Sequence, residues 1–288
     1  MGNSNQSLLK NKEVRKIIEL ALAEDCVSND VTSRLVIPEG LEATATLMAK
    51  ASGVLAGIEV FKAVFKTVDK KLSVDIRLSD RAALKPGDVA AVVSGRARSI
   101  LRAERTALNF ICHLSGIATA TSRYVERVAG LPVSIVDTRK TSAGQRLLEK
   151  HAVLCGDGHN HRMNLADGIL IKDNHIASLR RSGLSLSQMV SHAKEQNKIG
   201  LKIEVEVNSI AEAEEAASAG ADMLLLDNMS VADMKETASH LRGRVRLEAS
   251  GGITLENVRA VAETGVDIIS IGALTHSVKA LDFSLEMA

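Results

Sequence analysis

The 288-residue sequence has few aromatic residues, with no Trp, one Tyr and four Phe. Its hydrophobic fraction is nevertheless 45%, so we expect a core of aliphatic side chains. Lysines and arginines number 36 and aspartates and glutamates 35. This balance leaves no overall basic charge that would attract nucleic acid or a membrane surface. Any attraction for anions must therefore be local.

Cysteines are also scarce and widely separated. Cys26, Cys112 and Cys155 are an odd number without a Cys-x-x-Cys pair, which argues against a disulfide framework and against a zinc site made of cysteines. Residues 1–12 are polar, and no apolar run reaches the length of a membrane-spanning helix. These absences predict a soluble, cytoplasmic protein with reduced thiols.

The first part of the chain, residues 1–115, is expected to form a mixed α/β domain with an open sheet. Residues 13–24 place apolar side chains at helical spacing. We expect a second helix over Ile100–His113 and a third that begins at Leu114-Ser-Gly-Ile117. Between the first two helices lie short apolar runs typical of strands, at residues 43–49, 53–58, 72–78 and 89–95.

The second part of the chain is more regular. Central residues of its last four apolar runs, Val205, Leu225, Leu247 and Ile269, are 20, 22 and 22 residues apart, which fits a strand, a helix and two loops. Continuous apolar strands that alternate with helices indicate a parallel sheet covered on both sides. We expect this repeat to close into a barrel rather than form an open doubly wound sheet. The six predicted strands are residues 133–136, 169–171, 203–207, 223–226, 245–247 and 268–271.

Capping residues predict where two of the intervening helices begin and end. Ser209 followed by Glu212 has capping-box spacing, and Gly220 suits the left-handed position after a helix. Thr254 and Gly265 are expected to bound the last helix in the same way. The chain has neither a G-x-G-x-x-G after a strand nor a Walker loop, so a nucleotide-binding Rossmann or P-loop fold has little support.

Basic residues gather at the predicted strand ends, which meet at one rim in parallel α/β folds. Arg139 and Lys140 follow the first strand, Lys172 follows the second, and Arg162 lies in the loop between them. Such cations repel one another by about 4 kcal/mol at ~4 Å and an effective dielectric near 20, unless an anion lies among them. Arginine suits carboxylates and lysine suits phosphate. We therefore expect a multiply anionic substrate.

Glycine turns and carboxylates complete the predicted rim. Ser250-Gly-Gly252 and the turn at Gly272 follow the last two strands, where barrels commonly bind phosphate. Glu206 and Asp227 could bind Mg²⁺ or ribose hydroxyls, or stabilise a developing positive charge. Glu204 shares a strand face with Glu206, so the choice between them stays open. We expect His161 to act by hydrogen bonding, because the surrounding cations would oppose a metal.

These motifs, in this order, resemble those of the quinolinate phosphoribosyltransferase family over nearly the whole chain. The match is densest in the second part of the chain, where the basic and glycine-containing motifs lie. The motifs that carry the resemblance include Glu24-Asp25, Asp30-Val-Thr32, Gly53-Val-Leu-Ala-Gly57, Ala103-Glu-Arg-Thr-Ala-Leu-Asn109, Asp137-Thr-Arg-Lys-Thr141, His161-Arg162, Ile171-Lys-Asp-Asn-His175, Glu204-Val-Glu206, Leu226-Asp-Asn228, Ala249-Ser-Gly-Gly252 and Gly272-Ala-Leu-Thr-His-Ser277.

The resemblance implies a fold and a reaction. The fold is an N-terminal α/β sandwich, residues 1–115 joined by the tail 277–288, followed by a C-terminal incomplete, open α/β barrel over residues 116–276. The reaction joins quinolinate to phosphoribosyl pyrophosphate. It releases carbon dioxide and pyrophosphate and gives nicotinate mononucleotide for NAD biosynthesis.

The resemblance also implies roles for single residues. Arg105, Arg139, His161, Arg162 and Lys172 would hold the two carboxylates of quinolinate. Arg105 would come from a neighbouring subunit, so the active site would be shared in a homodimer, which could assemble further into a hexamer. Lys140, Glu206 and Asp227 would be catalytic, and the two carboxylates would also bind Mg²⁺. The remaining residues implied for the phosphoribosyl substrate are Ser250, Gly251, Gly252, Gly272 and His276.

Three departures from the family pattern and three alternatives remain. Asp157 replaces the middle glycine before His161-Arg162, Asn164 replaces a frequent glycine, and Ser142-Ala143 replaces a common Thr-Pro. An acidic Asp157 near an anion pocket puts the local loop geometry in doubt. The alternatives are a related enzyme acting on a different ring, a lyase that forms a Schiff base on Lys172, and a non-catalytic phosphate-binding protein.

Overall fold

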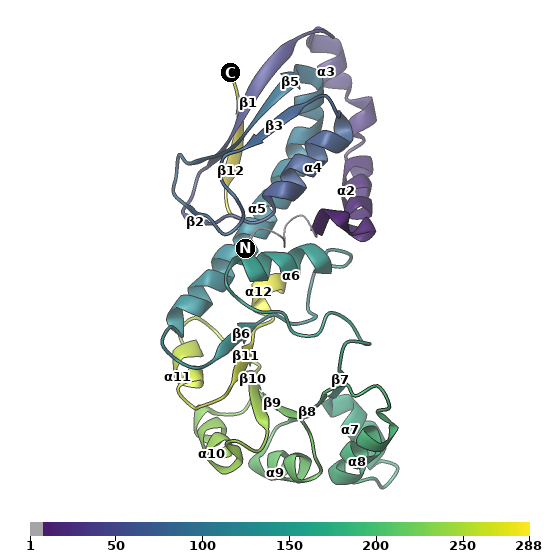
Figure 1. Cartoon of the computed structure of the whole chain (residues 1–288), viewed down its shortest axis with the longest axis vertical. Coiled ribbons are helices and arrows are strands. Elements are labelled where there is room, and N and C mark those ends of the chain that lie inside the picture. The colour runs from purple at the N-terminus through teal and green to yellow at the C-terminus, as the bar shows by residue number, and fades with distance from the viewer. Residues whose placement is uncertain (1–7) are drawn as a thin grey trace. The chain divides into compact units, whose positions relative to one another are not determined.

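The computed structural model describes residues 8–288, so the first seven residues of the polar segment 1–12 lie outside the described residues. The chain divides into two compact units (Figure 1). Neither unit is a single continuous stretch of sequence. The first contains the residues up to Ser122, Thr141–Asp157 and Leu274–Ala288, and the second contains Arg123–Lys140 and Gly158–Ala273.

A four-stranded antiparallel sheet forms the centre of the first unit. Its strand order is β12-β1-β5-β3, and β2 and β4 form a separate pair. β1 buries alternate residues, Ala45, Leu47 and Ala49, so one face of the sheet is covered. The strands are β1 (Glu42–Ala49), β2 (Gly53–Val54), β3 (Ser73–Ile76), β4 (Ala83–Leu84), β5 (Val89–Arg96) and β12 (Phe283–Met287).

Helices pack beside this sheet and give the α/β sandwich that was expected (Figure 1). The predicted opening helix is α2, whose first turn is capped because the Asn11 side chain accepts a hydrogen bond from the Glu13 N–H (2.8 Å). The helices are α2 (Lys12–Glu24), α3 (Val31–Val36), α4 (Ile58–Val68), α5 (Ala97–Arg127) and α6 (Arg146–Cys155), with a 3₁₀ turn at Val27–Asn29.

The break expected at Leu114-Ser-Gly-Ile117 was wrong, because α5 runs through it as one helix of 31 residues. The small residues there serve close packing instead. A Cβ atom on Gly116 would lie 2.5 Å from the Lys279 carbonyl oxygen. The buried Ser115 Oγ accepts a hydrogen bond from the Ala56 N–H (3.1 Å). Glycine at this position therefore lets the C-terminal segment approach the helix.

The second unit is built on a six-stranded parallel sheet with the order β6-β11-β10-β9-β8-β7. Each strand from β7 to β10 pairs with the next in sequence, and β11 returns to pair with the first strand, β6, as in an α/β barrel. All six predicted strands are confirmed. They are β6 (Ser134–Val136), β7 (Ile169–Ile171), β8 (Ile203–Val207), β9 (Met223–Asp227), β10 (Arg246–Ser250) and β11 (Ile268–Ser270).

The barrel is open between β6 and β7, so the closed barrel expected from the repeat was wrong and the incomplete barrel implied by the resemblance is confirmed. His159 occupies the free edge of β6 in place of a strand. Its N–H donates to the Ile135 carbonyl (2.9 Å), and its carbonyl accepts from the Asp137 N–H (3.1 Å). The loop that carries His161 and Arg162 therefore begins against the first strand.

Helices follow the strands of the second unit, and two capping predictions can be compared with them. Ser209 Oγ caps α9 by accepting from the Glu212 N–H (3.3 Å), and Gly220 has a φ of +93°. Thr254 does not begin α11, because its N–H donates to Asn257 Oδ1 in a preceding turn. No helix within residues 8–288 is long and apolar enough to cross a membrane. The helices are α7 (Asp173–Arg180), α8 (Leu186–Gln196), α9 (Ile210–Ser218), α10 (Val231–Leu241), α11 (Val258–Ala262) and α12 (Ala273–His276), the last at the boundary of the units.

Candidate active site

A cavity of about 470 Å³ lies at the carboxyl ends of the parallel strands in the second unit. Its lining combines basic residues, carboxylates and a glycine turn. Ten of the residues singled out in the sequence line it: Arg139, Lys140, His161, Arg162, Lys172, Glu206, Asp227, Ser250, Gly251 and Gly252. This meeting of strand ends follows from the parallel topology, because each βα connection leaves the sheet on the same rim.

Basic side chains are crowded at this rim. Burial, and then the nearby Arg139 guanidinium, lower the pKa of Arg162, while the Glu204 carboxylate acts in the opposite direction. Arg162 also donates to the Gly168 carbonyl oxygen (3.2 Å). Lys172 Nζ lies 3.6 Å from Glu206 Oε2 and is half exposed. Repulsion between two arginines at a partly buried site favours an anion between them.

Two buried carboxylates lie next to the His161 ring. Its Nε2 lies 3.2 Å from Glu204 Oε2 and 3.3 Å from Glu248 Oε2. Asp137, which is fully buried, accepts a hydrogen bond from the His161 N–H (2.9 Å). We call His161, Glu204 and Glu248 the floor trio. All three line a second cavity of about 280 Å³, and His161 and Glu248 also line the first.

The pKa values of His161 and Glu204 are both raised. Burial lowers the pKa of His161, but hydrogen bonds and charges from Glu204 and Glu248 outweigh it and raise that pKa to about 10. Burial also raises the pKa of Glu204. The Arg162 N–H donates to His161 Nδ1 (2.8 Å), a contact that a neutral ring makes with its proton on Nε2. His161 thus contacts the backbone of Arg162.

The floor trio also has three potential metal-ligand atoms within 4.8 Å of one another. The Nε2 proton and the adjacent guanidinium of Arg162 oppose a cation there. The hydrogen-bonding role expected for His161 stays a prediction.

The glycine turn after β10 allows a close approach between two loops. Gly251 has a φ of +87°, and a Cβ atom there would overlap Asn228 Oδ1. A Cβ atom on Gly252, whose φ is +62°, would meet no atom within 4 Å. Gly251 is thus required for packing against Asn228, whereas the backbone at Gly252 faces open space. Exposed backbone of this kind suits a phosphate group.

Two carboxylates on neighbouring strands face the cavity from the other side. Burial raises the pKa of Glu206, and the negative charges of Asp227 and Asp173 add to it while Lys172 acts against it. Asn228 Nδ2 donates to Asp227 Oδ2 (2.8 Å). Carboxylate oxygens beside a phosphate-sized space are the donor set that Mg²⁺ uses in phosphate-binding sites. The residues present therefore fit Mg²⁺.

The structure shows that Glu204 and Glu206 lie in different environments, a distinction that the sequence does not make. Both project to one face of β8, but Glu204 is buried in the floor trio whereas Glu206 is nearer the strand end and lines the cavity above it. Glu248, Asn228 and Ser270 also line the cavity although they were not selected as site residues. Their positions at the ends of predicted strands were the available signal.

Three selected residues do not line this cavity. Gly272 follows β11 without reaching the lining. Arg105 and His276 belong to the first unit, and both are exposed. Arg105 projects from α5, and His276 Nδ1 lies 2.7 Å from Ser277 Oγ.

Asp157 does not face the cavity either, which corrects the expectation that it lies near an anion pocket. It belongs to the first unit and pairs with Arg81 (2.9 Å). Its φ of +62° explains why glycine also suits this position. Asn164 makes a local turn by accepting from the Ala166 N–H (2.8 Å), and the Ser142 N–H donates to Glu149 (3.1 Å).

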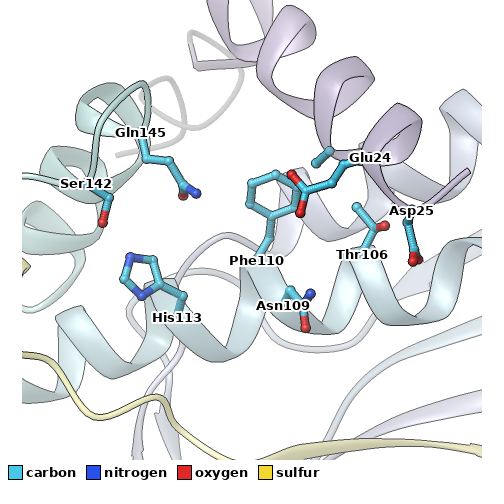
Figure 2. A pocket seen from close by; sticks show the side chains of 9 residues that line it. Glu24, Asp25, Thr106, Asn109, Phe110, His113, Ser142 and Gln145 are labelled. Carbon is cyan, nitrogen blue, oxygen red and sulfur yellow. The ribbon is translucent and has the colours of Figure 1, made fainter.

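The first unit contains a separate cavity of about 330 Å³ with a different chemistry (Figure 2). Glu24 and Asp25 line it at the end of α2, opposite residues of α5 that include Asn109 and His113. His113 already pairs with the buried Glu149 (2.9 Å). With two carboxylates and no arginine or lysine in its lining, this cavity does not suit an anionic substrate.

The fold and the cavity define an open parallel α/β barrel protein with a basic cavity at the carboxyl ends of its strands. The quinolinate phosphoribosyl transferase N-terminal domain matches residues 30–115, and the corresponding C-terminal domain matches residues 117–286. The chain belongs to the quinolinate phosphoribosyl transferase family.

Individual relatives agree with this assignment over most of their length. The chain is 40% identical to quinolinate phosphoribosyltransferase [decarboxylating] 1b of Nicotiana tabacum, over 96% of the chain and 82% of that protein. It is 38% identical to a probable nicotinate-nucleotide pyrophosphorylase [carboxylating] of Bacillus subtilis, over 97% and 95%. The solved structure of the nicotinate-nucleotide pyrophosphorylase from Francisella tularensis superposes with a TM-score of 0.89 at 38% identity, covering 96% of each chain.

Proposed function

We propose that this chain transfers the phosphoribosyl group of phosphoribosyl pyrophosphate to quinolinate, with loss of carbon dioxide. The products are nicotinate mononucleotide, carbon dioxide and pyrophosphate, and the reaction serves NAD biosynthesis. The observation that carries the proposal is the cavity of the second unit, where four basic residues face two carboxylates and a glycine turn. The names of the relatives point to the same reaction.

Quinolinate fits the basic part of the cavity by charge. Its two carboxylates would bind Arg139, Arg162 and Lys172, since guanidinium groups bind carboxylates through two parallel hydrogen bonds. Both ring nitrogens of His161 already have protein partners. His161 would therefore act as a positioning residue that fixes Arg162 rather than as a direct ligand.

Phosphoribosyl pyrophosphate fits the opposite part of the cavity. Its 5′-phosphate would bind the backbone of Ser250-Gly251-Gly252, and Lys140 would neutralise its pyrophosphate. Glu206 and Asp227 would hold Mg²⁺, which when bound supplies charge neutralisation for the leaving pyrophosphate. Gly272 and His276 are further residues proposed to serve this substrate.

The chemistry follows from these charges. As the bond between C1 of the ribose and pyrophosphate breaks, C1 gains positive charge that Glu206 or Asp227 can stabilise. The quinolinate nitrogen forms the new bond to C1 and becomes cationic. The adjacent carboxylate then leaves as carbon dioxide, because the electron pair left on the ring carbon is stabilised by the cationic nitrogen, and a proton completes that carbon. The main contribution of the site to catalysis is to hold the two anionic substrates together in the reacting orientation.

A product assay tests this proposal. Purified protein is mixed with quinolinate, phosphoribosyl pyrophosphate and Mg²⁺, and carbon dioxide and pyrophosphate are measured together. We expect equal amounts of both, and none when quinolinate is replaced by nicotinate. Pyrophosphate without carbon dioxide, or turnover of nicotinate, would instead indicate a relative that acts on a different ring.

The alternative functions have less support from the site. Schiff-base enzymes use a desolvated lysine, whereas Lys172 is half exposed beside Glu206. Borohydride trapping of an adduct with a carbonyl substrate would favour that alternative. A phosphate-binding protein without catalysis would bind both substrates and release no pyrophosphate.

We further propose a homodimer in which Arg105 completes the active site of the partner, with a hexamer as a possible larger assembly. Arg105 is exposed on α5 and belongs to the first unit. Mixing inactive Arg105→Ala with inactive Arg139→Ala should restore activity, because a mixed dimer contains one site with both arginines. Without exchange between subunits, or with Arg105 acting in its own chain, the mixture would stay inactive. We also propose that the protein works in the cytoplasm, which fractionation of cells would test.

A further inference from the structure

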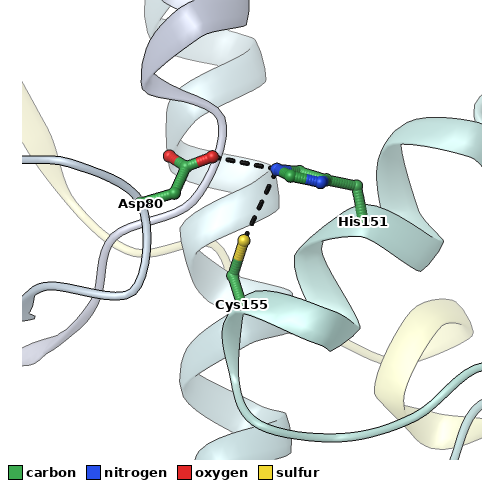
Figure 3. Close-up of side chains that lie close together, drawn as sticks. All are labelled: Asp80, His151 and Cys155. Carbon is green, nitrogen blue, oxygen red and sulfur yellow. Dashed lines mark hydrogen bonds and ion pairs between the residues drawn. The ribbon is translucent and has the colours of Figure 1, made fainter. Parts of the chain in front are cut away.

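Three potential metal ligands meet in the first unit, and none of them is a residue proposed to bind substrate. Asp80, His151 and Cys155 are only 8%, 9% and 3% exposed. His151 Nε2 lies 2.9 Å from Asp80 Oδ2 and 3.5 Å from Cys155 Sγ. Figure 3 shows both contacts ending on the same ring nitrogen. A single nitrogen carries either one proton or one lone pair, so Nε2 is shared between the carboxylate and the sulfur.

The distances are close to those around a tetrahedral zinc ion. Zn–S bonds of about 2.3 Å and Zn–N or Zn–O bonds of about 2.0–2.1 Å place sulfur ~3.6 Å from nitrogen and nitrogen ~3.3 Å from oxygen. The observed separations are 3.5 Å and 2.9 Å, and all three ligand atoms lie within 4.8 Å of one another. A cation between them therefore requires only a small outward shift of the carboxylate.

Two segments of the chain, α6 and the segment between β3 and β4, position the three potential ligands. His151 and Cys155 lie four residues apart on α6 and so share one face of the helix. Asp80 is oriented by its other oxygen, which accepts a hydrogen bond from the Ile58 N–H (2.9 Å). The ion pair between Arg81 and Asp157 (2.9 Å) joins the residues that flank the ligands. The site is thus built before any cation binds.

Charge also favours a divalent cation. A thiolate, a carboxylate and a neutral imidazole together neutralise Zn²⁺, and a neutral group is the least costly one to bury. Thiolate and imidazole ligands select Zn²⁺ over Mg²⁺, which prefers oxygen ligands and retains water.

We propose that Asp80, His151 and Cys155 bind one Zn²⁺ ion, with water as the fourth ligand, and that the ion joins α6 to the segment between β3 and β4. The role is structural, because α6 and this segment are separated by about seventy residues in sequence. Binding of Zn²⁺ as a thiolate complex replaces the proton of the Cys155 thiol, which passes to the solvent.

Cobalt titration tests the site directly, since Co²⁺ replaces Zn²⁺ and absorbs in the near ultraviolet when a thiolate binds it. Full-length protein is treated with a chelator, dialysed and titrated with Co²⁺. Cys26, Cys112 and Cys155 are the chain's only cysteines, and all belong to the first unit. Binding at Glu206, Asp227 or the floor trio therefore produces no thiolate band, and the result is independent of the proposed activity.

We expect a thiolate-to-cobalt band that saturates at one equivalent, disappears when Zn²⁺ is added and is lost in Cys155→Ser. Cys112→Ser is the matched control, and it should keep the band. His151→Asn keeps the sulfur and should weaken Co²⁺ binding by at least about tenfold. Absence of the band in the wild-type protein would overturn the proposal without any variant. Survival of the band in Cys155→Ser, or unchanged affinity in His151→Asn, would overturn it as well.

Discussion

The two units differ in where their basic residues gather, although both contain buried polar groups that pair. In the first unit, buried polar groups pair with one another, as Asp80 does with His151 and Glu149 with His113. In the second unit, Arg139, Arg162 and Lys172 gather around a cavity. Like charges that are brought together cost free energy unless a ligand compensates. The contrast therefore distinguishes side chains that stabilise the fold from side chains arranged for a substrate.

Sheet topology explains why the cavity forms where it does. The antiparallel strands of the first unit alternate in direction, so their ends point to both edges of the sheet. The parallel strands of the second unit direct every carboxyl end to one rim. Residues far apart in sequence, such as Lys140 and Ser250, therefore line the same cavity.

The largest effect on activity is expected when one basic side chain is removed from the rim of the second unit. Arg139→Ala is expected to lower turnover at least ~100-fold, which corresponds to about 2.7 kcal/mol of transition-state stabilisation, with the fold retained. Steady-state kinetics and circular dichroism measure the two properties. Arg259→Ala is the control, because Arg259 is exposed in the same unit and pairs with Glu263. Near-normal activity in Arg139→Ala would count against the assignment of the site.

A smaller but specific effect is expected at the glycine turn. Gly251→Ala should raise the KM for phosphoribosyl pyrophosphate roughly tenfold, because the methyl group displaces Asn228 and the turn that faces phosphate. Gly243→Ala is the control for backbone strain, since Gly243 has a φ of +75° and open space around it. If both variants change the KM equally, close packing against Asn228 is not the cause.

The floor trio should make stability depend on pH. Because the folded pKa of His161 is raised from 6.5 to about 10, its stabilising contribution is complete below pH 6.5 and lost as the pH rises towards 10. Glu248→Gln should reduce the free energy of unfolding by about 2 kcal/mol at neutral pH, and the difference should vanish above pH 10. Denaturant titrations across this range measure it, with exposed Glu263→Gln as the control. A difference that is constant with pH would contradict the account.

The smallest effect is expected at Asp157. Asn tolerates the left-handed conformation of this residue, so Asp157→Asn removes only the charge that pairs with Arg81. The exposed pair contributes less than about 1 kcal/mol, and the KM for quinolinate should not change. An altered KM in saturation kinetics would mean that Asp157 does act on the anion cavity.

The strands and the basic rim of the second unit could be predicted from the sequence for physical reasons. Strands covered on both sides must be continuously apolar, and their regular spacing reveals the repeat. Once the strands are placed, parallel topology brings Arg139 and Lys172 to one rim without further information. The fold class was therefore within reach of pattern and topology.

Long-range packing set the limit of these predictions. His159 contacts the edge of β6 at the opening of the barrel, and no local pattern marks that contact. The C-terminal segment packs against Gly116 in the middle of α5. Glu204 and Glu206 share one strand face, but they lie at different depths within the barrel. Each of these features joins residues that are distant in sequence or identical in pattern.

A crystal structure of the protein with quinolinate bound would test the central claim most directly. We expect the ligand in the cavity of the second unit, with its two carboxylates within hydrogen-bonding distance of Arg139, Arg162 or Lys172. Density for quinolinate in the first unit beside Glu24 and Asp25, with the cavity of the second unit open to solvent, would contradict the account.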